Sequence, residues 1–186
     1  MLYNSWDKDM ALTQPCIESI KSNIFKGCHF ANLEQSTDET LLMLDQYSGI
    51  DYIIKKPDNN MLGVAARIQW GNNWETFTIR KSRHTGTKTE YEKRKDAIKQ
   101  GYFYPALTMQ AYFTKDIKHL GSAIIKTKKL YDFIDWNPEK VHQRKSDNVF
   151  IYVNWADLID YGIVIYEGDG FITHKAPLPK QVEFNL

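Results

Sequence analysis

The chain has 186 residues, of which 42% are hydrophobic and 25% charged, with a formal net charge of +1. This length suits one domain with a buried core, and this composition excludes a disordered chain. No apolar run approaches the roughly 18 residues that span a bilayer, and the opening MLYNSWDKDM lacks the apolar stretch of a secretory signal. We therefore expect a single domain over residues 1–186, cytoplasmic and without a membrane partner.

The charge is unevenly distributed along the chain. Residues 1–58 hold five lysines and nine acidic residues, a net charge of −4, whereas residues 80–99 hold eight basic and three acidic residues, a net charge of +5. Because binding follows local potential, the basic middle predicts a surface for a polyanion such as nucleic acid. A solvated helix face with loop charges is the alternative explanation.

The N-terminal part predicts two helices. In QPCIESIKSNIF the isoleucines recur at helical spacing, which predicts an amphipathic helix over residues 15–26. Ser36 and Glu39 resemble a capping box, which predicts a second, short helix through Leu44.

Three runs with strand character follow, IDYIIKK (50–56), LGVAARIQW (62–70) and ETFTIR (75–80), separated by the turn sequences PDNN and GNN. The second and third alternate between apolar and polar residues, so we expect an antiparallel meander with one apolar and one polar face. The polar face of this meander would gather Asp51, Arg67, Gln69, Thr78 and Arg80.

The remaining sequence predicts further helices and strands. A basic helix is expected over residues 89–100, because EYEKRKDAIKQG combines helix formers with a terminal glycine. Later elements are strands at 106–113, 121–127 and 149–155, helices at 128–135 and 155–162, and an irregular C-terminal tail at 174–186. The predicted fold class is therefore α/β (α+β), a central mixed sheet with an antiparallel meander, flanked by helices.

The order helix, strand with an aspartate, turn, strand with a polar face, strand, helix, strand over residues 15–113 resembles the PD-(D/E)xK nuclease superfamily. GIDYII is similar to its first acidic motif, and VAARIQ stands where its D/E-x-K strand is expected. FTIR matches the third strand and EYEKRKDAIKQG the crossover helix. The resemblance implies a restriction-endonuclease-like core. It also implies a Mg²⁺ site in which two carboxylates hold the ion and a lysine orients the attacking water.

The resemblance assigns the site residues by position. Asp51 matches the first carboxylate, and Glu18 is the candidate for a helix glutamate that sometimes joins the site. The second motif departs from the pattern, because its acid and lysine fall on Ala65 and Arg67 or on Arg67 and Gln69. Arginine can bind phosphate but cannot act as a general base, and glutamine is a weaker metal ligand than a carboxylate. The candidate catalytic residues are Asp51, Arg67, Gln69 and Glu18.

A Mg²⁺ site in this chain would need a replacement acid. Asp45, six residues before Asp51, is the first candidate, and Glu34 and Glu75 are the next nearest in sequence. The predicted metal ligands are therefore Asp51 and Asp45. The alternative is that Asp51 begins its strand and forms an ion pair with Arg67 or Arg80.

Basic residues precede an aromatic segment in the middle of the chain. RKSRHTGTKTEYEKRK is followed by GYFYPALTMQAYF. Lysine and arginine would position a phosphate backbone and tyrosines would stack on bases, although such aromatics also form cores. The candidate nucleic-acid-binding residues are Arg80, Lys81, Arg83, Lys88 and Arg94.

Two functions remain open from the sequence. One is a PD-(D/E)xK-like nucleic-acid-binding protein, including an atypical Mg²⁺-dependent nuclease. The other is a non-catalytic protein-binding module, an inhibitor or accessory factor of phage or mobile-element origin. We expect the polar face to hold phosphate or an acidic side chain of a partner, with little Mg²⁺-dependent cleavage.

Overall fold

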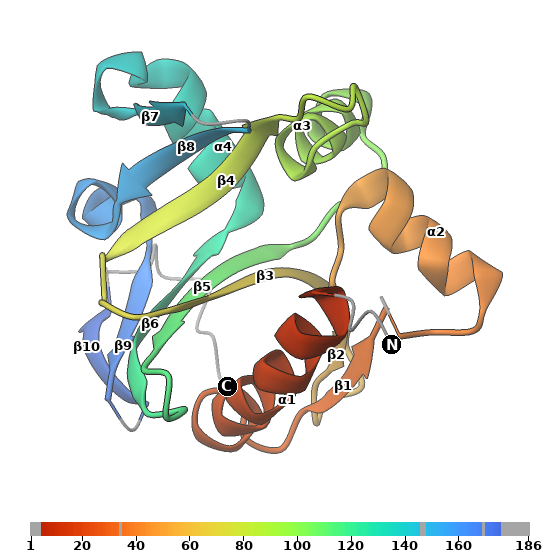
Figure 1. Cartoon of the computed structure of the whole chain (residues 1–186), viewed down its shortest axis with the longest axis vertical. Helices are drawn as coiled ribbons and strands as arrows, with labels where there is room; N and C mark the ends of the chain where they lie inside the picture. Colours follow the sequence, from red (N-terminus) through yellow and green to blue (C-terminus); the bar gives the residue numbers. More distant parts are fainter. Residues whose placement is uncertain (1–4, 34, 146–147, 169, 176–186) are drawn as a thin grey trace.

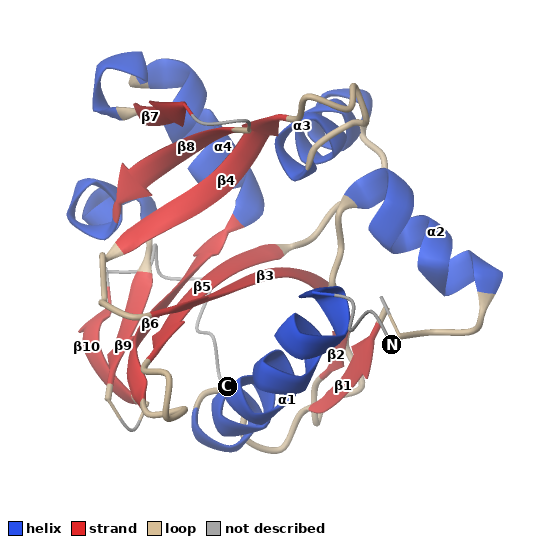
Figure 2. Cartoon of the chain, in the orientation of Figure 1, coloured by secondary structure: helices blue, strands red, loops and turns tan. Residues whose placement is uncertain are grey.

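The structure, a computed structural model, describes residues 5–33, 35–145, 148–168 and 170–175. It is a mixed α+β fold in which two sheets are flanked by helices (Figures 1 and 2). The helices are α1 (Ser5–Asn23), α2 (Glu39–Ser48), α3 (Glu90–Gln100) and α4 (Thr127–Trp136), with 3-10 helices η1 (Pro138–Lys140) and η2 (Trp155–Tyr161). Within these ranges, no helix is long and apolar enough to cross a membrane.

The central sheet, sheet A, has seven strands in the order β1-β2-β3-β5-β6-β9-β10. β3 and β5 run parallel, and the other neighbours are antiparallel. A parallel pair needs a crossover connection, and α3 lies in the connection here. The strands are β1 (His29–Asn32), β2 (Tyr52–Lys55), β3 (Met61–Trp70), β5 (Leu107–Phe113), β6 (His119–Lys126), β9 (Val164–Glu167) and β10 (Phe171–Lys175).

A second, antiparallel sheet, sheet B, has the order β4-β8-β7 and consists of β4 (Thr76–Ser82), β8 (Val149–Asn154) and β7 (His142–Lys145). The predicted meander is therefore correct for β2 and β3 and wrong for its third strand, because β4 pairs with β8 and not with β3. Positive φ angles at Gly71 (117°) and Glu75 (51°) lie in the connection that carries the chain away from sheet A. The place beside β3 is taken by β5.

One face of sheet A packs against α1, which lies across it in Figure 1. Ile17, Ile20 and Ile24 of α1 are buried in a cluster with Val64 of β3 and Met109 of β5. The predicted alternation of β3 is correct, because its even-numbered residues from Val64 to Trp70 belong to this cluster or pack against it. The odd-numbered polar residues of β3 therefore lie on the opposite face.

A second core connects sheet B to sheet A through α4. Phe77 and Ile79 of β4 are buried with Leu130 and Phe133 of α4 and with Tyr112 of β5. This apolar contact explains why β4 does not form the third strand of the meander. Phe77 and Ile79 are buried against α4 and Tyr112, and burying apolar side chains stabilises the fold.

Several element boundaries differ from the prediction. α1 begins at Ser5 rather than at residue 15, so Pro15 lies inside the helix. Asp38, not Ser36, caps α2, by accepting hydrogen bonds from two backbone N–H groups. The predicted tail lies outside the described residues from residue 176 onward, and residues 174 and 175 end β10. The strands β1, β7, β9 and β10 were not predicted.

Candidate functional site between two polar sheet faces

The polar face of sheet A carries the residues to which the sequence resemblance assigned a site. Arg67 lies opposite Gln110 of β5, and continuing the β2–β3 register by one residue places Asp51 opposite Ala65. Residues paired across strands point to the same face, so Asp51, Arg67, Gln69 and Gln110 share it. Gln110 is 1% exposed and donates from Nε2 to Oε1 of Gln69 at 3.1 Å.

The polar face of sheet B turns toward this surface. Cross-strand pairing aligns Thr78, Tyr152 and His142 in one row. The next row consists of Arg80, Phe150 and Arg144. Hydrogen bonds connect the sheets: the backbone N–H of Thr78 donates to Gln110 Oε1 at 3.3 Å, and the Tyr112 hydroxyl lies 2.9 Å from both the carbonyl and the hydroxyl of Thr76. The two polar faces therefore converge.

The convergence leaves a cavity of about 150 Å³, here called the inner cavity. Its walls come from both sheets and from α3, and they include Asp51, Arg67, Thr78, Arg80, Glu90 and Arg94. The sequence predicted that these polar side chains lie on one meander. In the structure they come from both sheets and line the same cavity.

Asp51 is held by groups of the protein. Its Oδ2 accepts the backbone N–H of Ala66 at 2.6 Å and lies 3.7 Å from Nη2 of Arg94. Arg94 is only 6% exposed, and its Nε donates to the carbonyl of Gly49 at 3.0 Å. The alternative interpretation of Asp51, an ion pair with an arginine, is therefore correct, but the arginine is Arg94 and not Arg67 or Arg80.

Arg94 was itself a candidate nucleic-acid-binding residue. Its side chain is buried in this ion pair and is not exposed at a binding surface.

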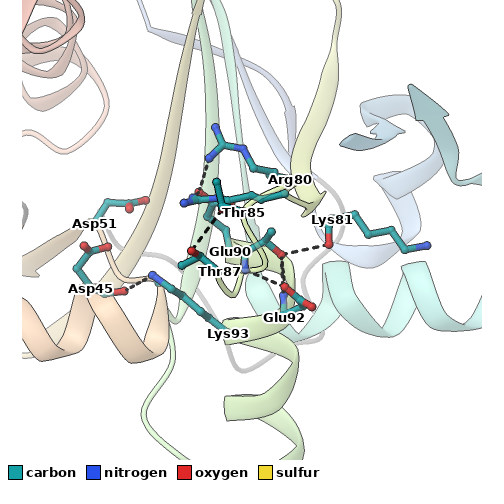
Figure 3. A network of polar contacts seen from close by, with 12 residues as sticks. Asp45, Asp51, Arg80, Lys81, Thr85, Thr87, Glu90, Glu92 and Lys93 are labelled. Carbon is teal, nitrogen blue, oxygen red and sulfur yellow. Dashed lines mark hydrogen bonds and ion pairs between the residues drawn. The ribbon is translucent and has the colours of Figure 1, made fainter. Parts of the chain in front are cut away.

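Glu90 is the second acid of the inner cavity and forms ion pairs with two further arginines, of which Figure 3 labels Arg80. Its Oε1 lies 2.9 Å from Nη2 of Arg83 and 3.5 Å from Nη1 of Arg80. Burial alone would raise the pKa of Glu90, but its backbone hydrogen bond and the surrounding arginines hold the pKa below its ordinary value. Glu90 is therefore a stable anion in this site.

Arg67 has no acidic partner among the residues that the structure describes. Its guanidinium lies 5.1 Å from the ring centre of Phe150, and that of Arg80 lies 5.4 Å from the same ring. The Nε atom of Arg67 is buried without a hydrogen-bond partner. Burial lowers the pKa of Arg67, Arg80 and Arg94 lower it further, and Glu90 opposes this. A half-buried cation without an adjacent counter-ion favours a bound anion.

A larger open groove of about 810 Å³, here called the outer groove, begins at Arg67 and extends along sheet B. Its lining includes Arg67, Gln69, Trp74, Arg144, Phe150 and Tyr152. No carboxylate lines it within the described ranges. The chain has five arginines, and four of them line the inner cavity or the outer groove. The fifth, Arg83, pairs with Glu90 of the inner cavity. Arginine is favoured over lysine where buried or planar contacts to phosphate and carboxylate are made.

Other predicted site residues lie elsewhere. Glu18 is an exposed residue of α1, which covers the opposite face of sheet A, and it pairs with Lys21 at 3.0 Å. Its expected place beside Asp51 is therefore wrong, because the apolar face of α1 packs on the sheet and Glu18 lies outside it. Lys88 is exposed and pairs with Asp96 at 2.7 Å, and Lys81 lies at the end of β4 outside both lining sets.

The candidate replacement acids do not surround Asp51. Asp45 is half-buried near the end of α2 and does not line the inner cavity, although Figure 3 shows it on the same side of the network as Asp51. Burial raises the pKa of Asp45, and Lys93 and Arg94 partly offset this. Glu75 is exposed and Glu34 lies outside the described residues. Across the described ranges, no three His, Cys, Asp or Glu side chains group in a way that could hold a metal.

Several residues of the site were missed from sequence. Glu90, Gln110 and Arg144 lie in α3, β5 and β7, far from Asp51 in sequence. No local sequence pattern therefore indicates that they share a site with Asp51. Phe150, Tyr152 and Asn154 were detectable, because VFIYVN alternates in the same manner as β3 and places all three on one face.

No protein-family model matches the chain, and no curated protein sequence matches it significantly. The geometry and charge of the site therefore carry the functional conclusion.

Replacing Arg94 by methionine should lower the free energy of unfolding by about 3 kcal/mol, because it leaves the Asp51 carboxylate without its buried partner. Urea unfolding measures the effect. Adding Asp51→Asn should recover part of the loss, since the double variant no longer contains the unpaired charge. The exposed control Lys88→Met should unfold at the wild-type midpoint. Equal midpoints for Arg94→Met and wild type would show that the pair does not stabilise the fold.

Replacing Asp45 by asparagine should stabilise the fold at neutral pH. A carboxyl whose pKa is higher in the folded than in the unfolded chain destabilises the fold once it ionises, so the cost appears as pH rises above the ordinary value of 3.8. Urea unfolding at a series of pH values should show an advantage of Asp45→Asn that grows with pH. The exposed control Asp160→Asn should show no such trend. Thermal stabilisation of wild type by Mg²⁺, lost in Asp45→Asn, would instead support Asp45 as a metal ligand.

Proposed function

We propose that this chain is a PD-(D/E)xK-like nucleic-acid-binding protein whose polar face binds phosphate in place of a catalytic metal. The observation that carries the proposal is Arg67, a half-buried guanidinium without an acidic partner where the inner cavity meets the outer groove. A phosphate oxygen would satisfy both its charge and its free N–H groups.

The arrangement of the elements supports the restriction-endonuclease-like part of the proposal. α1 covers one face of sheet A, Asp51 precedes β2, and β3 carries the polar positions. α3 then lies in the crossover to β5, which runs parallel to β3. This is the order on which the resemblance to the superfamily rests, with β4 in a second sheet as the departure.

The chemistry of the site does not fit a Mg²⁺ centre of the family type. The strand position that would supply the second carboxylate is Ala65, and the Asp51 carboxylate already accepts a backbone N–H and pairs with Arg94. Mg²⁺ requires several oxygen ligands, and the positive charges of Arg67 and Arg94 disfavour a further cation nearby. The residues present therefore favour anion binding over metal-dependent cleavage.

The second candidate function, a non-catalytic protein-binding module, has its own supporting observation. Met43 and Tyr47 of α2 are 53% and 63% exposed, and Tyr102 after α3 is 64% exposed. Exposed apolar side chains of this kind mark surfaces that contact proteins. This surface shares no residue with the inner cavity or the outer groove.

Replacing the two arginines that line the outer groove should weaken nucleic-acid binding. The variant Arg67→Gln with Arg144→Gln should bind fluorescein-labelled oligonucleotides at least roughly tenfold more weakly in an anisotropy titration. The slope of log K against log salt should become shallower by about 2, because two phosphate contacts are lost.

A matched control removes two charges elsewhere. Lys26 and Lys55 are exposed and line neither the inner cavity nor the outer groove, and their double replacement by glutamine should leave affinity and salt slope near wild type. If the arginine and lysine variants lose affinity equally, binding depends on total charge and not on this site. Absence of binding to any nucleic acid at low salt would refute the proposed function and leave the protein-binding alternative.

Cleavage tests the metal question separately. We expect no Mg²⁺-dependent nicking of supercoiled plasmid by the wild-type chain. Ala65→Glu with Arg67→Lys places a second carboxylate opposite Asp51, so Mn²⁺ should raise the thermal unfolding midpoint of this variant and not that of wild type. Nicking by the wild-type chain that Asp51→Asn abolishes would show that the chain is an atypical nuclease.

A further inference from the structure

The structure assigns the outer groove to an unpaired nucleic-acid strand, with a base stacked on its aromatic side chains and phosphates at Arg67 and Arg144. This inference rests on the proposed function and specifies its substrate class, single strand rather than duplex. It depends on the lining of the outer groove, which includes Arg67 and Gln69 of the motif and further residues of sheet B.

Two aromatic side chains of the outer groove are available to a ligand. Trp74, in the connection before β4, is 65% exposed although it is one of the largest apolar side chains. Tyr152 of β8 is half-buried and stacks on His142, with ring centres 5.0 Å apart and an angle of 24° between the ring planes. Base–aromatic stacking is worth about 1–3 kcal/mol per base and tolerates every base.

Phe150 has a different role in the outer groove. Its ring contacts the guanidinium groups of Arg67 and Arg80 at 5.1 and 5.4 Å. Phe150 therefore holds positive charge in a groove that Trp74 and Tyr152 also line. Cations and aromatic rings thus occur together in the groove, the combination that binds a flexible strand through its phosphates and its bases together.

The lining distinguishes a single strand from a duplex. The faces of bases are covered by their neighbours inside a double helix, so stacking on protein rings requires unpaired or extruded bases. Side-chain amides of Gln143 and Asn154 also line the groove and are able to bond the edges of such bases. The described lining contains no carboxylate to repel the backbone.

The experiment compares ligands and variants in the full chain. Fluorescein-labelled dT20, rU20 and a 20-base-pair duplex are titrated by anisotropy at several salt concentrations. Wild type should bind dT20 or rU20 at least about tenfold more tightly than the duplex. Trp74→Ala should lower the single-strand affinity by roughly tenfold with an unchanged salt slope, because it removes stacking and not charge. Tyr152→Ala should lower it as well.

The control is another exposed tryptophan. Trp136, at the end of α4, is 70% exposed and is not among the residues that line the outer groove, so Trp136→Ala should bind as wild type does. Equal affinity for duplex and single strand, or full affinity in Trp74→Ala, would overturn the inference. If duplex binding then still depends on Arg67 and Arg144, the proposed function survives alone. Failure of all three ligands to bind would overturn both.

Discussion

The buried guanidinium of Arg94 determines how charge is arranged in this fold. It binds the Gly49 carbonyl and the Asp51 carboxylate at once, and so holds α3 against the segment that leads into β2. A buried arginine is costly without a partner, and Asp51 supplies one. Glu90 is similarly occupied by Arg80 and Arg83. The two carboxylates face four guanidinium groups, and within the described residues Arg67 is in ion-pair contact with neither acid, so positive charge exceeds negative charge and the site favours anions.

Arginines at the positions that the resemblance assigns to a metal site would keep one property of such a site and change another. A divalent ion and a pair of guanidinium groups both present positive charge to a phosphate, but only the metal activates a water molecule for attack. Arginine does not lose its proton in the accessible pH range and cannot take the role of a general base. A chain with this arrangement is suited to holding a phosphodiester, while the aromatic outer groove beside it would select how the bases are presented.

How far the sequence predicts the structure depends on the range of the interactions involved. β2, β3, β5, β6, α3 and α4 follow from local periodicity and capping, and the period of two also places Arg67 and Gln69 on one face. The partner of β4 does not follow, because its choice between β3 and β8 depends on burial of Phe77 and Ile79 against α4. The four-residue strands β1 and β7 lack the β-branched residues that mark the equally short β2, whereas β9 has them and was overlooked. The pairing of Asp51 with Arg94 and the position of Glu18 away from Asp51 could not be predicted from local sequence. Both depend on how α3 and α1 pack against the sheet.

The route of the chain between the two sheets has a consequence for dissecting the protein. The chain leaves sheet A to form β4, returns for β5 and β6, leaves again for β7 and β8, and returns for β9 and β10. Every cut between β4 and β9 therefore separates strands that must pair with one another. Neither sheet can therefore be expressed as a single continuous fragment that contains all of its own strands and none of the other sheet. A protease nick in the connection before β7 should leave the two pieces associated, because each piece contributes strands to both sheets.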